Sequence, residues 1–127
     1  FKSRQAVRRA IRYSPGAFII VVGCYAQISP EEISRIPGVN MILGTEEKFR
    51  VLDYIEGLDE TDNVIIKRDL NDFRFCNGED DGYSTERTRA FLKVQDGCDY
   101  FCSYCIIPYA RGKSRSRNYL DILKQAE

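Results

Sequence analysis

The amino-acid sequence predicts an α/β fold built on parallel strands. Segments with a helical period alternate with short apolar runs along the first half of the chain, as in folds with crossover helices. The apolar runs at residues 17–22 and 39–43 are continuous rather than alternating, which is typical of strands covered on both faces. Pro-Gly pairs at positions 15–16 and 37–38 separate the elements. We therefore expect a parallel sheet with right-handed crossovers.

The first predicted elements are a helix, a strand and a second helix. Residues 3–13 form an amphipathic pattern, with apolar side chains on one face and arginines on another. The strand at 17–22 follows. The segment "SPEE" then predicts a short helix with Ser29 as N-cap, Pro30 as its first residue and Glu32 completing a capping box.

A strand at 39–43, a further helix and a third strand continue the alternation. Thr45 is the expected N-cap of that helix, whose apolar residues recur at helical spacing up to Leu58. The segment "VIIK" at 64–67 predicts the third strand.

A change of composition divides the chain into two predicted domains. Residues 1–67 form the α/β unit, and the polar, acidic segment 68–88 is the expected linker. The second unit, 89–127, begins with a strand at 89–95 and ends with a helix at 118–126.

Composition favours no charged partner and indicates no membrane-spanning segment. The sequence has 19 basic and 19 acidic residues, so its net charge favours no particular partner. No apolar run approaches the 18 or so residues that would span a membrane. The first segment has neither an initiating Met nor a signal-peptide core, so we expect the chain to begin within a longer protein.

The cysteines carry the strongest chemical signal. The sequence has five cysteines and no histidine, which excludes Ser-His-Asp catalysis and histidine-containing zinc sites. The odd cysteine count and the crowding of three thiols favour ligands in a reducing, cytoplasmic compartment over disulfides. Those three are Cys98, Cys102 and Cys105, in the segment "QDGCDYFCSYC".

The spacing of this triplet suits a cluster with one open iron. A [4Fe–4S] cluster usually takes four cysteine ligands. Three thiolates therefore leave one iron open to a substrate or a cofactor. The alternative is a zinc site that folds a basic loop onto RNA, in which Cys24, Cys76 or a carboxylate supplies the fourth ligand.

The triplet resembles the signature of the radical S-adenosylmethionine superfamily, in which an aromatic residue precedes the last cysteine. The resemblance implies that Cys98, Cys102 and Cys105 ligate a [4Fe–4S] cluster and that Tyr104 lies against the adenine of S-adenosylmethionine. The open iron would chelate the cofactor, which the reduced cluster cleaves to a 5′-deoxyadenosyl radical. Strand 89–95 would be the first of a (β/α) barrel with active-site loops at its carboxyl ends.

Together with "GCYAQ" and "IPGVNMILGT", the triplet also resembles the methylthiotransferases that modify tRNA or a ribosomal protein. Their Gly-Cys-x-x-Gln motif matches Gly23, Cys24 and Gln27, which implies that Cys24 ligates a second [4Fe–4S] cluster for sulfur insertion. The other two ligands would lie before Phe1, and Cys76 matches no ligand position.

This resemblance implies what each part of the chain is. Residues 1–67 would be a parallel-sheet remnant of the N-terminal methylthiotransferase domain, and 89–127 the first βα unit of a radical-SAM (β/α) barrel. Most of the barrel and the family's C-terminal RNA-binding domain would then be missing, and the chain should not turn over alone.

The sequence around the triplet is most similar to that of enzymes that add a 2-methylthio group to N6-threonylcarbamoyladenosine beside the anticodon of tRNA. Sister enzymes that act on isopentenyladenosine or on a ribosomal protein share the cysteines and the "RG" step. The implied cofactors are two [4Fe–4S] clusters and S-adenosylmethionine. The implied partners are tRNA and proteins that donate sulfur and electrons, in the cytoplasm and away from membranes.

A basic segment follows the cysteines. Four cations occur within seven residues with no acid among them: Arg111, Lys113, Arg115 and Arg117. Beside a cluster loop, such cations would bind an RNA backbone. The alternative is an ordinary solvated surface.

Overall fold

The computed structural model describes residues 2–55, 63–72 and 91–126. The chain divides into two compact units, Phe1–Arg68 and Asp69–Glu127. Their assignment to the domains of a methylthiotransferase stays a prediction.

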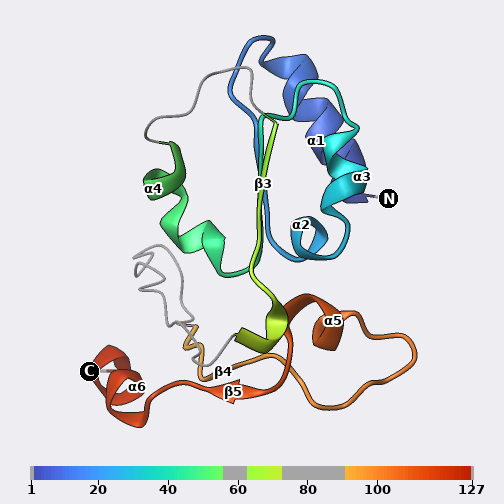
Figure 1. The fold of residues 1–127 in the computed structure, drawn as a ribbon. Coiled ribbons are helices and arrows are strands. Elements are labelled where there is room, and N and C mark those ends of the chain that lie inside the picture. The colour runs from blue at the N-terminus through green and yellow to red at the C-terminus, as the bar shows by residue number, and fades with distance from the viewer. Residues whose placement is uncertain (1, 56–62, 73–90, 127) are drawn as a thin grey trace. The chain divides into compact units, whose positions relative to one another are not determined.

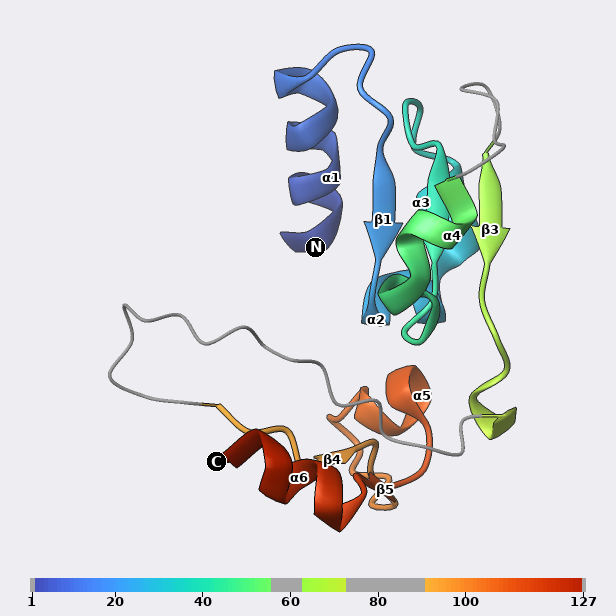
Figure 2. The same cartoon turned by 90° about the vertical axis from the view of Figure 1, so that its left-hand side faces the viewer.

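The first unit is built on a parallel sheet, as predicted. Its strands β1 (Ile20–Val22), β2 (Met41–Leu43) and β3 (Val64–Ile66) pair in the order β1-β2-β3. All three run in the same direction (Figure 2), with Ile20 opposite Met41 and Met41 opposite Val64. Their carboxyl ends therefore meet at one edge of the sheet, which places Gly23, Gly44 and Lys67 on neighbouring strands at that edge.

Helices cover both faces of this sheet. In chain order they are α1 (Lys2–Tyr13), α2 (Cys24–Ile28), α3 (Pro30–Ser34), the 3-10 helix η1 (Glu47–Arg50) and α4 (Val51–Ile55). Helices α1 and α3 lie on one face and α4 on the other (Figure 1).

The core of the first unit lies between the sheet and the helices α1 to α3. Every residue of β2 is buried, as expected for a central strand covered on both faces. Val21, Ile33 and Ile42 form the centre of the cluster, and Val7 and Ile11 of α1 pack against it. Each large aliphatic side chain buried in this way contributes about 1.5–3 kcal/mol.

The first strand departs from its prediction. It begins at Ile20 rather than at residue 17, and Val22 is 47% exposed. Because β1 is at the edge of this sheet, its last residue has fewer covering neighbours than β2. Burial on both faces, predicted for this strand, is therefore wrong at Val22.

Two predicted helix caps are also wrong in their details. Ser29 is the N-cap of α3 and Pro30 is its first residue, but the Ser29 side chain makes no cap hydrogen bond. Glu32 instead accepts a hydrogen bond from Arg4 Nη1 at 2.5 Å, which competes with the capping box. The helix predicted from Thr45 to Leu58 is present as η1 and α4, with Glu46 rather than Thr45 at the N-cap position, and its predicted last residues, 56–58, lie outside the described residues.

The second unit contains short elements around a two-stranded sheet. They are the 3-10 helix η2 (Leu70–Asp72), β4 (Gln95–Asp96), α5 (Ile107–Arg111), β5 (Arg115–Ser116) and α6 (Tyr119–Ala126). The predicted C-terminal helix is confirmed as α6. No helix over the described ranges is long and apolar enough to cross a membrane.

The predicted barrel strand at 89–95 is not confirmed. Of that range, residues 89–90 lie outside the described residues and 91–94 have no regular structure. Strand β4 begins only at Gln95 and pairs with β5 in the antiparallel direction, whereas a barrel strand needs a parallel neighbour. The predicted linker 68–88 lies outside the described residues after position 72.

Candidate metal centre

The three cysteines of the triplet lie on one loop, residues 97–106, which we call the cysteine loop. It leads from β4 into α5, and its thiols are all free. Cys102 is exposed, and Cys98 and Cys105 are half-buried. A turn joins the last two, because the Cys105 N–H donates to the Cys102 carbonyl at 3.0 Å.

The chemistry of these donors fits an iron–sulfur cluster. Free thiols accessible from solvent are the ligands that such clusters take. Among the described residues, no three Cys, Asp or Glu side chains are grouped closely enough to hold a metal ion. The structure thus brings the three thiols onto one loop without gathering them around one point.

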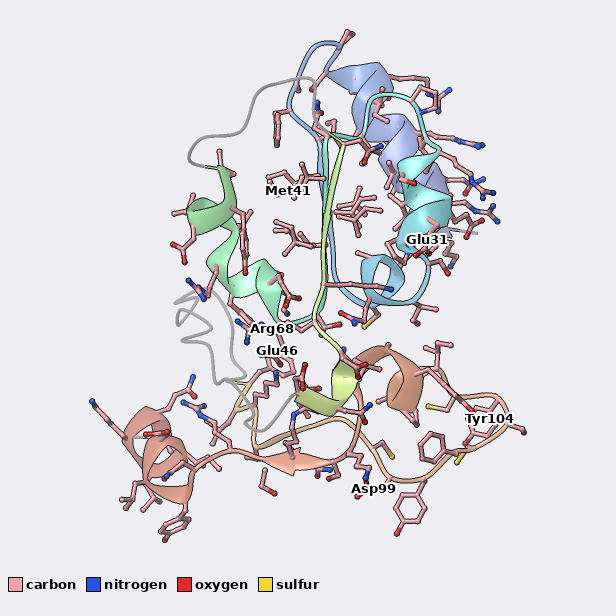
Figure 3. The ribbon with its side chains drawn as sticks, in the orientation of Figure 1. Glu31, Met41, Glu46, Arg68, Asp99 and Tyr104 are labelled. Atoms are coloured by element: carbon pink, nitrogen blue, oxygen red, sulfur yellow. The ribbon has the colours of Figure 1, made fainter. Side chains whose placement is uncertain are left out.

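The tip of the cysteine loop is aromatic and open to solvent. Tyr104, the predicted adenine contact, is 90% exposed. It lies at the outer end of the loop (Figure 3). The rings of Phe101 and Tyr109 meet edge to face with centroids 5.6 Å apart, so this contact ties the tip to α5.

The base of the cysteine loop, in contrast, is fixed by backbone contacts. The Cys98 N–H donates to the Gly112 carbonyl at 3.1 Å. Gly97 has φ 74°, and a Cβ there would lie 2.1 Å from the Lys113 carbonyl oxygen. Only glycine allows so close an approach. The Asp99 carboxylate also accepts the Ser114 N–H at 3.0 Å.

Asp96 is a buried carboxylate directly before this base, and its side chain is only 7% exposed. Its Oδ2 accepts from Lys93 Nζ at 3.0 Å, and its Oδ1 accepts from the Gly97 N–H at 2.9 Å and from Arg111 Nη1 at 3.3 Å. Burial raises the pKa of Asp96, but the hydrogen bonds from Lys93 and Gly97, with the Lys93 and Arg111 charges, lower it more. The pKa therefore lies below its ordinary value. The carboxylate is thus charged at neutral pH.

The four cations of the basic segment do not form one surface. Arg111 contacts Asp96, and Arg115 is buried, where its Nη1 donates to the carbonyls of Arg111 at 2.7 Å and Lys113 at 2.9 Å. Arg117 donates to Gln125 and to the Asp121 carbonyl. Lys113 is exposed on the turn between α5 and β5.

Cys24, the predicted ligand of a second cluster, lies at the carboxyl edge of the parallel sheet. It is the first residue of α2, which the sequence did not predict, and it follows Gly23 with φ 97°. In open parallel sheets this edge is where ligands bind. Cys24 is half-buried and free.

Gln27 of the same motif joins the ends of the other two strands. Its side chain is buried; Oε1 accepts the Thr45 N–H at 3.0 Å, and Nε2 donates to the Arg68 carbonyl at 3.0 Å. Thr45 follows β2 and Arg68 follows β3, so one amide links both strand ends to α2. Arg68 lies at this edge (Figure 3).

Glu47 adds a buried carboxylate beside Gln27. The residue is 2% exposed, and its Oε1 lies 3.6 Å from Arg68 Nε. A Cβ at Gly44 would lie 2.4 Å from Gln27 Oε1 and 2.5 Å from Glu47 Oε2, so any larger residue there would displace these two polar groups.

Sequence reasoning missed Asp96, Gly97 and Glu47. The available signal for the first two was "QDG" directly before Cys98, since a glycine after a strand often marks a close backbone approach. Nothing in the local sequence indicated that Glu47 is buried, because its burial depends on how η1 packs near the carboxyl ends of the strands.

Comparisons with known proteins give three informative relatives. The chain is 46% identical over 127 residues to the threonylcarbamoyladenosine tRNA methylthiotransferase of Bacillus subtilis, covering 99% of the chain and 28% of the relative. It is 39% identical over 112 residues to the ribosomal protein uS12 methylthiotransferase of Clostridioides difficile, covering 86% of the chain and 24% of the relative. It is also 34% identical over 123 residues to the tRNA-2-methylthio-N(6)-dimethylallyladenosine synthase of Trichlorobacter lovleyi, covering 91% of the chain and 27% of the relative.

Neither a family model nor a solved structure matches the chain. The relatives agree in the class of reaction that their names state and differ in the substrates. Over the 24–28% of their length that it spans, the chain belongs to the methylthiotransferase family.

Proposed function

We propose that the chain carries the cofactor-binding loop of a radical S-adenosylmethionine methylthiotransferase. Cys98, Cys102 and Cys105 would hold a [4Fe–4S] cluster with one iron open to the cofactor. The observation that supports this most directly is three free thiols on one solvent-accessible loop whose base is fixed by backbone contacts. The resemblance of the loop to the radical superfamily and the names of the relatives agree with it.

The residues of the chain would bind and orient the cofactor. The three thiolates bind the cluster, and exposed Tyr104 offers a ring for the adenine. When bound, the cluster supplies the electron for reductive cleavage of S-adenosylmethionine. Gly97 and Gly112 allow the start of the cysteine loop to lie directly against the turn that follows α5.

Cys24 would be one ligand of a second [4Fe–4S] cluster that supports sulfur insertion. Its support is its place at the carboxyl edge of a parallel sheet, held there by Gln27. The remaining ligands would come from residues outside this chain, and sulfur and electrons from cytoplasmic donor proteins.

The substrate we propose is N6-threonylcarbamoyladenosine in tRNA, which becomes its 2-methylthio derivative. The support is the B. subtilis relative, whose name states that class of tRNA. Of the four predicted RNA-binding cations, exposed Lys113 is best placed for a phosphate, whereas Arg115 is buried.

Anaerobic reconstitution with iron and sulfide tests the cluster. The wild-type chain should turn brown and bind about four irons on its three-cysteine loop. Cys98→Ala, Cys102→Ala and Cys105→Ala should each lose most of that iron. Cys24→Ala is the matched control and should keep it, because Cys24 belongs to a different predicted site.

A colourless protein with one stoichiometric zinc would contradict this proposal. That result would instead support a zinc-stabilised RNA-binding module without catalysis. Iron that persists in all three loop variants would also contradict it, because the cluster would then have other ligands.

A further inference from the structure

We propose that Asp96 is a positioning residue of the cysteine loop and that Arg111 and Arg115 serve the same role rather than binding RNA. These residues, with Gly97 and Gly112, form what we call the clasp. The inference deepens the proposed function and rests on it, since it concerns how the cluster-binding loop is held.

The clasp joins the start of the cysteine loop to the turn that follows α5. Strand β4 leads into the loop and β5 follows α5, and Asp96 pairs with Arg115 across these strands. Just beyond the paired residues of the two strands, the Cys98 N–H donates to the Gly112 carbonyl at 3.1 Å. The first cysteine therefore has its backbone tied directly to the turn that closes α5.

The Asp96 carboxylate joins the same two segments through side chains. It accepts from the Gly97 N–H at the start of the loop and from Arg111 at the end of α5, at 2.9 and 3.3 Å. Hydrogen bonds to a charged acceptor are roughly twice as strong as neutral ones. One buried charge thus ties the start of the cysteine loop to the end of α5.

Arg115 completes the clasp from the other side. Its Nη1 donates to the carbonyls of Arg111 and Lys113, which flank Gly112. These contacts orient the turn so that the Gly112 carbonyl can accept from Cys98. A buried guanidinium bound to backbone carbonyls cannot also present itself to a phosphate, which explains why the cations of this segment differ in role.

Lys113 shows the contrast within the same turn. Its side chain is exposed, whereas its backbone carbonyl lies against Gly97 and accepts from Arg115. Lys113 is thus exposed, whereas Arg115 is buried and the partly exposed Arg111 binds Asp96.

Two variants and a matched control test the clasp in the 127-residue chain. Asp96→Asn keeps the shape and removes the charge, and Arg111→Gln removes one partner. Asp121→Asn on α6 is the control, because that residue is exposed in the same unit. The first readout is amide hydrogen exchange of Cys98 in the metal-free chain. The second is iron per chain, with the electron paramagnetic resonance spectrum, after reconstitution.

In Asp96→Asn we expect the Cys98 amide to exchange about tenfold faster, as for the loss of a charge-assisted hydrogen bond. Amides of α6 should keep wild-type rates. Iron loading should fall at least about twofold and the cluster spectrum should broaden, since the thiols lose their fixed base. Arg111→Gln should act in the same direction but less, and adding it to Asp96→Asn should have less than the additive effect.

Three outcomes would overturn the inference. Unchanged Cys98 exchange and iron loading in Asp96→Asn would show that the carboxylate positions nothing. Faster exchange throughout α6 as well would make it a general stabiliser of the unit. If Arg111→Gln weakened RNA binding without altering Cys98 exchange, Arg111 would be an RNA-binding residue and would not position the loop.

The design separates this inference from the proposed function. A wild-type chain that assembles no cluster contradicts the function, and Cys98 exchange in the metal-free chain then decides by itself whether Asp96 holds the loop. A wild-type chain that loads normally, beside an Asp96→Asn chain that behaves identically, contradicts only the inference.

Discussion

At the scale of single residues, glycine decides how closely the backbone can approach at the cysteine loop. Gly97 and Gly16 have similar positive φ values, 74° and 82°, but different surroundings. A Cβ at Gly97 would meet the Lys113 carbonyl oxygen at 2.1 Å, whereas nothing lies within 4 Å of one at Gly16. The pair therefore separates the cost of backbone conformation from the cost of the contact.

We predict that Gly97→Ala destabilises the second unit more than Gly16→Ala destabilises the first. Each substitution should cost about 1–2 kcal/mol for the left-handed backbone. Gly97→Ala should cost about 1–3 kcal/mol more, because the new atom overlaps rigid backbone. Amide hydrogen exchange, read separately in each unit, measures both. Equal losses at the two sites would show that the Lys113 contact is not maintained in solution.

At the scale of elements, the ends of the parallel strands depend on one buried amide. Gln27 accepts from Thr45, two residues after β2, and donates to Arg68, two residues after β3, at 3.0 Å in both cases. The strands have three residues each, so these two bonds are a large share of what holds that edge. Helix α2, which begins at Cys24, is anchored to the sheet in the same way.

Gln27→Ala should destabilise the first unit by about 1–3 kcal/mol, the cost of removing the acceptor from a buried N–H group. The amide of Thr45 should lose most of its exchange protection, because its acceptor is Gln27 Oε1. Gln5→Ala on exposed α1 is the control and should have almost no effect. Retained protection at Thr45 in Gln27→Ala would disprove the link between the strand ends.

The sequence predicted elements where the physics is local. The continuous apolar run "VNMIL" correctly indicated a strand buried on both faces, and the period of "NYLDILKQA" correctly indicated a helix. It could not predict that Glu32 pairs with Arg4 rather than capping α3, because the partner is 28 positions away. The antiparallel pairing of β4 with β5 could not be predicted either, because it also joins residues that are distant in the sequence.

The features of the candidate site also divide into those that depend on local sequence and those that depend on contacts between distant segments. Cysteine spacing is a local property, so the triplet could be found and its chemistry predicted from the sequence alone. The burial of Arg115 and the contacts of Asp96 depend on how two segments close around the cysteine loop. Four cations in seven residues therefore resembled one surface, although Arg115 is buried and Arg111 binds the Asp96 carboxylate.

At the scale of the whole molecule, the chain consists of two units, and each carries predicted ligands of an iron–sulfur cluster. The predicted set is complete in the second unit and partial in the first. The second unit, Asp69–Glu127, contains all three cysteines of the radical-type triplet. The first, Phe1–Arg68, contributes Cys24 alone. The second unit can therefore be tested for cluster chemistry within this chain, whereas the cluster proposed at Cys24 would need ligands besides that residue.

The central claim is that the cysteine loop leaves an iron open to S-adenosylmethionine, and electron paramagnetic resonance tests it most directly. The reconstituted chain, reduced with dithionite, is measured with and without the cofactor, beside Cys102→Ala. We predict a reduced [4Fe–4S] signal that shifts when S-adenosylmethionine is added and that is absent from Cys102→Ala. A signal that ignores the cofactor, or one that survives in Cys102→Ala, would contradict the account.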